Sequence, residues 1–329
     1  MTVDRTHVLQ AVDVLQRGGL VAFPTETVYG LGADASNPEA VGRIFAVKGR
    51  PARHPLIVHL AAADDMPHWA ATVPATALRL TDALWPGPLT VVVPRSDLVP
   101  DVVTGGLGTV GLRVPAQPMA LDLLEAFGGG VAAPSANRFG RVSPTSAADV
   151  VADLGPDVDF VLDGGPCAVG LESTIVDCSD TEPVVLRLGG VTLQQLQDVL
   201  GAPVAVAGAA AAAGRAPGTL AGHYAPRCRV VLAGGDDAGR IAAANLDTGR
   251  RVAVLAAAPV AELPAGAEQL DPAGDAGAYA HCLYARLRDA DARGVDVLVV
   301  VPPSEAGIGA AVADRLRRAA ASTSDRPDA

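Results

Sequence analysis

The sequence is almost devoid of lysine. Lys48 is the only lysine among its 25 lysine and arginine residues, so arginine supplies nearly all of the positive charge. The 36 acidic residues outnumber these basic ones and give a net charge of −11. This balance argues against a protein that binds nucleic acid in bulk, because such proteins present broad basic faces to the phosphate backbone. A local basic cleft remains compatible with it.

Aromatic residues, cysteines and long apolar runs are also scarce. Only 3% of the chain is aromatic although 50% is hydrophobic, so we expect a core of small aliphatic side chains. The four cysteines show no CxxC spacing and no histidine at zinc-finger distance. This pattern favours buried free thiols in a reducing cytoplasm. No apolar run reaches the ~18 residues of a membrane span, and residues 1–5 start no apolar signal segment, so we expect a cytoplasmic protein without membrane contact.

The order of apolar segments predicts an α/β protein with a mixed sheet in its first part. The length of 329 residues favours two domains. Strands are expected at 20–23, 56–60, 89–93, 110–114, 131–133, 160–162, 173–176 and 184–187, and helices at 8–16, 38–47, 75–84, 146–154 and 192–200. Helices are too few for a regular βαβ series, which indicates a mixed sheet.

A change of composition separates a second domain from the first. Residues 202–227 are rich in alanine, glycine and proline, which is typical of a linker. Strands are then expected at 229–232, 252–256 and 295–301, with helices at 240–245, 276–292 and 305–321. The sequence thus predicts a first domain at 1–201, a linker at 202–227, a small Rossmann-like α/β domain at 228–321 and a disordered tail at 322–329.

Several polar segments lie directly after the predicted strands. The segment PTETVYGLG (24–32) begins with hydroxyl residues that either hold a small polar ligand or cap a turn. The segment KGRP (48–51) places Lys48 two residues from Arg50 in a loop bounded by glycine and proline. A compact ammonium and a planar guanidinium together suit an oligophosphate, which offers both single and paired oxygens.

Further strand ends carry hydroxyl residues and arginines. In APSAN (133–137) and SPT (143–145), hydroxyl and backbone N–H groups can cradle phosphate, although Ser143 also fits the N-cap of a helix at 146–154. Arg50, Arg113 and Arg187 lie at the margins of apolar strands or Gly/Pro loops and resemble a convergent anion clamp. His59 ends an apolar strand, where a packed core histidine is the more common case. The sequence contains no Ser/His/Asp order, HExxH or Walker A motif, so we expect catalysis by positioning and charge neutralisation.

The segment GLGADA (30–35) matches the loose dinucleotide pattern GxGxxG/A. In a dinucleotide fold the strand runs directly into the glycines and then into a helix. Here six residues (24–29) separate the predicted strand from the first glycine, and no acidic ribose ligand follows a second strand at the right distance. A dinucleotide site is therefore not favoured.

The segments together resemble the YrdC-like threonylcarbamoyl-AMP synthase family. PTETVYGLG, KGRP with PLIVH, WPGPLT, GLRVP, APSAN with SPT, ESTIV and LRLGG occur in the family's order over about residues 8–200. The segments APG (216–218) and HYAP (223–226), followed by a small α/β domain, resemble its long two-domain form. The resemblance implies a twisted open mixed sheet. It also implies synthesis of L-threonylcarbamoyl-adenylate from L-threonine, bicarbonate and ATP, with release of pyrophosphate, for N6-threonylcarbamoyladenosine in tRNA.

The resemblance also assigns residues to the two substrates by position. The positions that match the threonine site are Thr25, His59, Arg113 and Ser173. The positions that match the nucleotide side are Lys48, Arg50, Thr109, Ser135, Asn137, Ser143 and Arg187. Lys48 and Arg50, with Mg²⁺, are expected to neutralise the leaving pyrophosphate, and Arg113 is expected to bind the threonine carboxylate bidentately. The implied partners are the proteins that transfer the threonylcarbamoyl group to tRNA, and weak direct tRNA binding stays open.

We add one hypothesis about the linker. An aromatic residue is unexpected in a passive spacer, so Tyr224 is predicted to contact the bound nucleotide as part of a segment that closes over the site and excludes water. The alternative is that Tyr224 only docks the linker on the second domain.

The sequence departs from the family pattern at two places, and two other functions are considered. Phe139 replaces the serine usual in PSANxSG, and TLAG (219–222) lacks the basic residue often found there. An RNA-binding module without catalysis is the first alternative, and threonine-dependent ATP–pyrophosphate exchange separates it from the enzyme. The second is carbamoyl transfer as in hydrogenase-maturation relatives, whose acylphosphatase and zinc-finger segments this sequence lacks.

Overall fold

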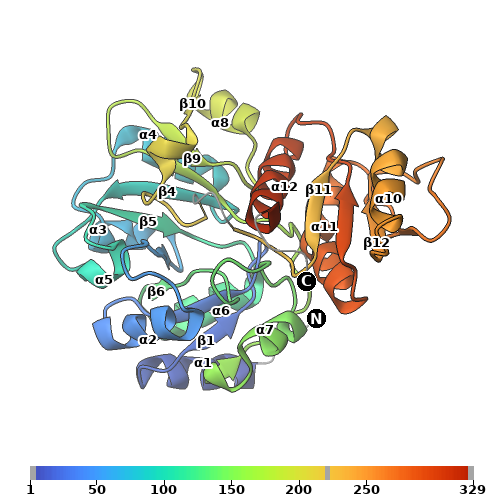
Figure 1. Ribbon diagram of the computed structural model, residues 1–329. Helices are drawn as coiled ribbons and strands as arrows, with labels where there is room; N and C mark the ends of the chain where they lie inside the picture. Colours follow the sequence, from blue (N-terminus) through green and yellow to red (C-terminus); the bar gives the residue numbers. More distant parts are fainter. Residues whose placement is uncertain (1–4, 219–222, 325–329) are drawn as a thin grey trace. The chain divides into compact units, whose positions relative to one another are not determined.

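The computed structural model describes residues 5–218 and 223–324. The chain divides into two compact units (Figure 1). The first comprises Met1–Phe139, Ser143–Ala168 and Glu172–Leu220, and the second comprises Gly140–Val142, Val169–Leu171 and Ala221–Ala329. Two short segments from within the predicted first domain thus belong to the second unit.

The first unit is built on a ten-stranded mixed sheet with the strand order β10-β9-β8-β4-β5-β3-β6-β2-β1-β7. The strands are β1 (Val21–Phe23), β2 (Gly30–Asp34), β3 (Ile57–His59), β4 (Leu89–Pro94), β5 (Thr109–Arg113), β6 (Val131–Ala132), β7 (Phe160–Val161), β8 (Thr174–Asp177), β9 (Val184–Arg187) and β10 (Ala205–Val206). Strand β3 is parallel to β5 and β4 is parallel to β8, whereas β4 and β5 are antiparallel. The predicted open mixed α/β sheet is confirmed.

Helices connect these strands. They are α1 (Arg5–Gln16), α2 (Pro38–Lys48), α3 (Met66–Trp69), α4 (Ala75–Leu84), α5 (Asp101–Thr104), α6 (Pro118–Phe127), α7 (Ala147–Leu154), α8 (Leu193–Leu200) and α9 (Ala209–Ala212), with 3₁₀ turns at Ala63–Asp65 and Gly155–Asp157. Asn37 caps α2 by accepting the backbone N–H groups of Glu39 and Ala40, as its residue type predicts. Helix α7 is capped by Ser146, so Ser143 as its N-cap is wrong.

The two faces of the sheet differ because successive side chains of a strand point to opposite sides. Val58, Val91 and Leu112 belong to the large apolar cluster that also contains residues of α2, α4 and α8. A second cluster joins α1 and α6 to β1 and β6. A third joins Ile57 of β3 to Ala216. His59 and Arg113 are two residues from Ile57 and Gly111 along their strands, so they lie on the face opposite Val58 and Leu112.

Strand β2 was not expected from the sequence. Its glycines occur in GLGADA, but Gly30–Asp34 pairs antiparallel with β1 instead of forming a phosphate-binding turn. A Cβ atom on Gly32 would lie 2.7 Å from Cγ1 of Val131 and 2.8 Å from the Phe23 ring. The glycine therefore permits close packing, and this segment does not form the strand–turn–helix of a dinucleotide fold.

Residues 202–218, expected as part of a linker, have secondary structure and cluster with the first unit. Strand β10 extends the sheet by pairing in parallel with β9. Ala216 is 5% exposed and packs in the third apolar cluster. Alanine and valine suit an edge strand and a packed turn as well as a spacer, so composition alone did not distinguish them. Residues 219–222 of the expected linker lie outside the described residues.

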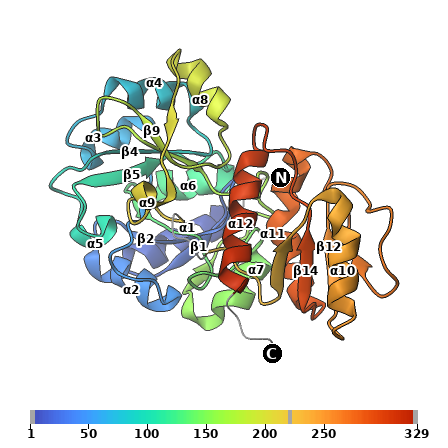
Figure 2. The same ribbon diagram turned by 45° about the horizontal axis from the view of Figure 1, so that its top comes forward.

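The second unit contains a four-stranded parallel sheet with the order β11-β14-β12-β13. Its elements are β11 (Arg229–Leu232), β12 (Val252–Leu255), β13 (Glu268–Gln269), β14 (Val297–Val300), α10 (Ala238–Leu246), α11 (Ala276–Ala292) and α12 (Gly309–Ser324), with a 3₁₀ turn at Gly235–Asp237. Figure 2 shows α10 on one face of this sheet and α11 and α12 on the other. The predicted small α/β domain with a parallel sheet is confirmed.

The end of the chain differs from the prediction. Helix α12 continues to Ser324, so residues 322–324 of the expected tail are helical, and residues 325–329 lie outside the described part. Across the described residues, no helix combines the length and apolarity that spanning a bilayer requires.

Candidate active site

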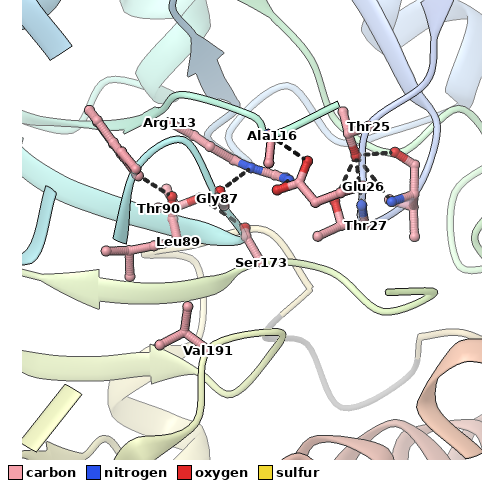
Figure 3. A network of polar contacts seen from close by, with 12 residues as sticks. Thr25, Glu26, Thr27, Gly87, Leu89, Thr90, Arg113, Ala116, Ser173 and Val191 are labelled. Carbon is pink, nitrogen blue, oxygen red and sulfur yellow. Dashed lines mark hydrogen bonds and ion pairs between the residues drawn. The ribbon is translucent and has the colours of Figure 1, made fainter. Parts of the chain in front are cut away.

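Arg113 ends β5 and is fixed from two sides (Figure 3). Its Nε donates a hydrogen bond of 3.3 Å to the carbonyl oxygen of Gly87, and its Nη2 donates one of 2.6 Å to Oε1 of Glu26. Gly87 must be glycine, because a Cβ atom there would lie 2.3 Å from the carbonyl oxygen of Leu84. The guanidinium is held by the WPGP turn and the PTET loop, and only 4% of the residue is exposed.

Thr25 forms the turn that carries Glu26. Its hydroxyl donates to the carbonyl oxygen of Val28 at 2.6 Å and accepts the backbone N–H groups of Thr27 and Val28 at 3.2 Å each. The hydroxyls of Thr25 and Thr27 also lie 2.7 Å apart, so every contact of the Thr25 hydroxyl is within this loop. Of the two roles expected for these hydroxyls, the capped turn is present. Thr25 thus affects the site by shaping the loop.

His59 lies next to Arg113, because these residues are paired in the register of β3 and β5. The imidazole is 4% exposed and meets the Phe23 ring edge-on, with 5.6 Å between the ring centroids. Burial lowers the pKa of His59 to about 3, and the positive charge of Arg113 contributes to this shift. At neutral pH the imidazole is therefore uncharged and does not repel the guanidinium.

We expect His59 to make the protein less stable in acid. The unfolded chain takes up a proton at the usual histidine pKa of 6.5, whereas folded His59 does so only near 3. Neutral His59 therefore contributes its full stabilisation above the unfolded-state pKa of 6.5. This contribution is lost as the pH falls toward the folded-state pKa, by about 1.4 kcal/mol per pH unit. Urea unfolding between neutral pH and about pH 5 should show a steeper loss for the native chain than for His59→Gln. Equal slopes would contradict this assignment.

A second group of hydrogen bonds joins β4, β8 and β9. The hydroxyls of Thr90 and Ser173 are 2.8 Å apart (Figure 3). Arg187 donates through Nη2 to the Ser173 hydroxyl at 3.2 Å and to the Ser173 carbonyl oxygen at 2.9 Å. Its Nη1 donates to the carbonyl oxygen of Pro217 at 2.9 Å. The structure thus brings the predicted residues Ser173 and Arg187 together and adds Thr90, which the sequence analysis missed.

Lys48 joins the KGRP and APSAN segments. It is the last residue of α2, and Gly49 ends the helix in the left-handed conformation with φ of 63°. Its Nζ donates to the carbonyl oxygens of Ser135 and Asn137, and only 3% of the residue is exposed. Burial holds the pKa of Lys48 well below its usual value, and the charge of Arg50 lowers it further. A bound anion would favour the charged form again.

Arg50 lies beside Phe139, the residue that departs from the family pattern. The guanidinium carbon is 5.9 Å from the centroid of the Phe139 ring, within the range of a cation–π contact. Nη2 of Arg50 also donates to the carbonyl oxygen of Pro55 at 3.0 Å. The backbone N–H of Phe139 donates to the carbonyl oxygen of Lys48 at 2.8 Å. Phe139 therefore supports the KGRP loop with both its ring and its backbone.

Ser143 and Thr109 are the remaining residues that the resemblance assigns to the nucleotide. The hydroxyl of Ser143 is buried and donates to Oε1 of Glu172 at 2.7 Å, an acidic partner that the sequence analysis did not select. Thr109, at the start of β5, lines a narrow cavity of about 10 Å³, which has room for about one water molecule. Residues of β3, β4 and β5 line this cavity together with Ala216 and Pro217, and most of the lining is apolar.

Tyr224 belongs to the second unit. Its ring stacks on Tyr284 with 5.7 Å between centroids, and the guanidinium carbon of Arg315 lies 5.0 Å from it. The residue is 1% exposed. A contact of this side chain with a nucleotide would therefore require the ring to leave its packing in the second unit.

We expect Tyr224→Ala to destabilise the second unit and Tyr224→Phe to be well tolerated. Removing a buried aromatic ring costs about 3–5 kcal/mol, whereas phenylalanine keeps the contacts with Tyr284 and Arg315. Chemical unfolding of the full chain measures the difference between the two variants. An alanine variant as stable as the phenylalanine variant would show that the ring does not contribute through packing.

The remaining sequence expectations concern thiols and metals. All four cysteines are free; Cys282 is half-exposed and the other three are buried. The expectation of free thiols is confirmed, and burial holds for all but Cys282. In the part of the chain that the structure describes, no three His, Cys, Asp or Glu side chains are grouped to hold a metal ion.

Comparison with known proteins assigns both parts of the chain. Residues 13–189 match the family model described as Telomere recombination, and residues 191–321 match the model described as Threonylcarbamoyl-AMP synthase, C-terminal domain. The threonylcarbamoyl-AMP synthase of Pyrococcus abyssi is 41% identical over 94% of this chain and 92% of its own length. The synthase of Bacillus subtilis is 37% identical over 97% of this chain and 94% of its own length.

A solved structure agrees with these matches. The crystal structure of Pyrococcus abyssi Sua5 complexed with L-threonine has a TM-score of 0.93 and 38% identity to this chain, covering 98% of this chain and 96% of that one. Since sequence and fold agree over nearly the whole length, the chain belongs to the threonylcarbamoyl-AMP synthase family, in the form that carries the C-terminal α/β domain.

Proposed function

We propose that one face of the ten-stranded sheet binds both substrates in the synthesis of L-threonylcarbamoyl-AMP, the reaction that this chain catalyses. The enzyme uses L-threonine, bicarbonate and ATP, and the product serves the N6-threonylcarbamoyladenosine modification of tRNA. Hydrogen bonds, burial and charge within the first unit support a role for particular residues in binding threonine and ATP.

Arg113 is proposed to bind the carboxylate of threonine. Among the described residues its Nη1 makes no hydrogen bond, whereas Nε and Nη2 are used by Gly87 and Glu26. A guanidinium held in this way can present its remaining edge to a carboxylate. Neutral His59 and the hydroxyl of Ser173 are proposed to contact the rest of the amino acid. The Pyrococcus abyssi relative, whose structure was solved with L-threonine, supports a threonine site in this fold.

The nucleotide is proposed to bind through the KGRP and APSAN segments and beside Thr109. Lys48 and Arg50 would meet the phosphates, together with Ser135, Asn137 and Ser143. The surroundings of Thr109 are mostly apolar and include Pro55, but the narrow cavity there has room for only about one water molecule, so a base would have to widen it. Arg187 supports this side through its hydrogen bond to Pro217.

The chemistry requires two bond-forming steps. The amine of threonine, after loss of a proton, forms a carbamate with CO₂ from bicarbonate. A carbamate oxygen then attacks the α-phosphorus of ATP, and pyrophosphate leaves with the bonding electron pair. We propose that Lys48 and Arg50 stabilise the charge on the leaving group. Mg²⁺ would reach the site bound to the ATP phosphates, because this ion is usually held by substrate phosphates together with one or two carboxylates.

One observation carries this proposal. Lys48 is a buried ammonium group whose pKa is lowered by burial and by the adjacent Arg50, and it already organises the Ser135–Asn137 loop. Such a site gains most from a polyanionic ligand. Release of pyrophosphate that depends on both threonine and bicarbonate tests it. An RNA-binding module without catalysis would release none.

The remaining assignments concern partners and location. We propose that the product passes to the proteins that transfer the threonylcarbamoyl group to tRNA, in the cytoplasm. The net charge of −11 favours at most weak direct binding of tRNA. A nucleotide contact by Tyr224 is retained as a proposal, with the condition that its ring leaves the contact with Tyr284.

A further inference from the structure

We infer that Glu26 is a positioning residue for threonine, because it fixes the direction in which the guanidinium of Arg113 meets the substrate carboxylate. The inference rests on the proposed role of Arg113. Glu26 lies in the PTET loop and was not among the site residues expected from the sequence.

Both carboxylate oxygens of Glu26 are used in a single clamp (Figure 3). Oε1 accepts from Nη2 of Arg113 at 2.6 Å, and Oε2 accepts the backbone N–H of Ala116 at 3.0 Å. Ala116 follows β5 three residues after Arg113. One carboxylate therefore ties the side chain of Arg113 to the backbone of the segment that directly continues its own strand.

The clamp leaves one defined part of the guanidinium for a ligand. Nε is held by Gly87 and Nη2 by Glu26, while Nη1 has no hydrogen bond within the described residues. An arginine side chain otherwise has about 2 kcal/mol of rotamer entropy to lose on binding a ligand. Because Glu26 and Gly87 have already removed this freedom, threonine meets a preorganised partner.

Charge neutralisation gives Glu26 a second effect on the free enzyme. The side chains of Arg113 and Glu26 are only 5% and 9% exposed. A single buried charge without a partner is destabilising by several kcal/mol and would favour a rotamer that reaches water. The ion pair keeps Arg113 in its buried position before threonine arrives. The opposing effect is repulsion between Glu26 and the substrate carboxylate, so the sign of the Glu26→Gln effect decides between positioning and competition.

The length of the side chain matters as well as its charge. The turn of Thr25 fixes the backbone next to Glu26 through two N–H groups and one carbonyl oxygen. Aspartate at this position keeps the charge but is one methylene shorter, so it cannot span both Arg113 and Ala116. Glutamine keeps the length but has only one acceptor oxygen for two donors.

The experiment uses the full chain with Glu26→Gln and Glu26→Asp, and it uses Glu125→Gln as a matched control. Glu125 is exposed in α6 and takes no part in the clamp. The values of kcat and KM are measured for threonine and for ATP separately. They are also measured with L-threoninamide, which lacks the carboxylate. Thermal unfolding of each variant shows whether it is folded.

Both Glu26 variants are expected to raise the KM for threonine by about tenfold, with the KM for ATP changed less than about twofold. The preference for threonine over threoninamide should fall by a similar factor, and Glu125→Gln should leave all of these values unchanged. If Glu26 had only a general structural role, its variants would change the KM for threonine and the KM for ATP alike and would not change this preference. An unchanged preference, or a lower KM for threonine in Glu26→Gln, would overturn the inference.

Arg113→Ala separates failure of the inference from failure of the proposed site. If Arg113→Ala keeps the preference for threonine over threoninamide, the carboxylate assignment itself is wrong. If it abolishes the preference while both Glu26 variants keep it, only the inference about Glu26 fails. The double variant Glu26→Gln with Arg113→Ala should lose no more of the preference for threonine over threoninamide than Arg113→Ala alone, because the two residues act as one unit.

Discussion

Adenylate formation is expected to fall by about 100-fold or more when Lys48 is replaced by alanine, because a cation that neutralises transferring phosphate in a preorganised site contributes about this much. Lys48 donates to the carbonyl oxygens of Ser135 and Asn137, so its loss also releases the loop that would contact the nucleotide. Binding of ATP should weaken more than binding of threonine. Pyrophosphate release and calorimetry with each substrate measure the two effects.

Two companion variants separate charge from shape. Lys48→Met keeps most of the side-chain length without the ammonium, so a loss equal to that of alanine assigns the effect to charge. Arg50→Ala should cause a loss of the same order, since Arg50 lies in the same loop and packs on Phe139. Near-native rates in both Lys48→Ala and Arg50→Ala would refute the phosphate assignment.

The unique lysine allows an independent check. Because the chain contains no other lysine, an amine-directed reagent has only Lys48 and the N-terminal amine as targets. Only 3% of Lys48 is exposed, so labelling reports the openings of the site in which its amine meets the reagent, and burial with the charge of Arg50 lowers the pKa of this amine. ATP should protect Lys48 from labelling in a peptide map, and threonine alone should protect it less. Equal protection by the two ligands would argue against the assignment.

The sequence was sufficient for the parts of the fold that local patterns determine. Apolar strands such as β4 and β5 and capped helices such as α2 were predicted close to their observed bounds. The family resemblance placed KGRP and APSAN on the same, nucleotide side, and Lys48 bonds directly to two carbonyl oxygens of APSAN. In the strands and helices, the residue types restrict the local conformation strongly enough to predict it.

Elements that depend on distant partners were not predicted. Strand β2 looks like a loop because its glycines have no β propensity, and only the close approach of Phe23 and Val131 explains them. Strand β10 is only two residues long, and it forms by pairing in parallel with β9. Glu26 and Thr90 act through Arg113 and Ser173, which are 87 and 83 residues away in the sequence. No spacing rule within a single chain reveals such pairs.

Replacing Arg113 by alanine is expected to raise the KM for threonine by about 100-fold, while the affinity for ATP changes little. The loss removes a charge-assisted, bidentate carboxylate contact, which is worth about 2–3 kcal/mol, and 1.4 kcal/mol corresponds to a factor of ten. It also leaves the carboxylate of Glu26 buried without its cation, so the site would carry an uncompensated negative charge facing the substrate carboxylate.

Calorimetry with threonine and with ATP, each alone, tests this expectation for Arg113→Ala. The double variant with Glu26→Gln removes the unpaired negative charge and reports how much of the loss comes from repulsion by Glu26. Arg113→Lys keeps a positive charge but not the fork, and since Gly87 and Glu26 already use Nε and Nη2, a single ammonium cannot replace all three contacts. If Arg113→Ala no longer bound ATP but still bound threonine with native affinity, the proposed roles of Arg113 and Lys48 would be reversed.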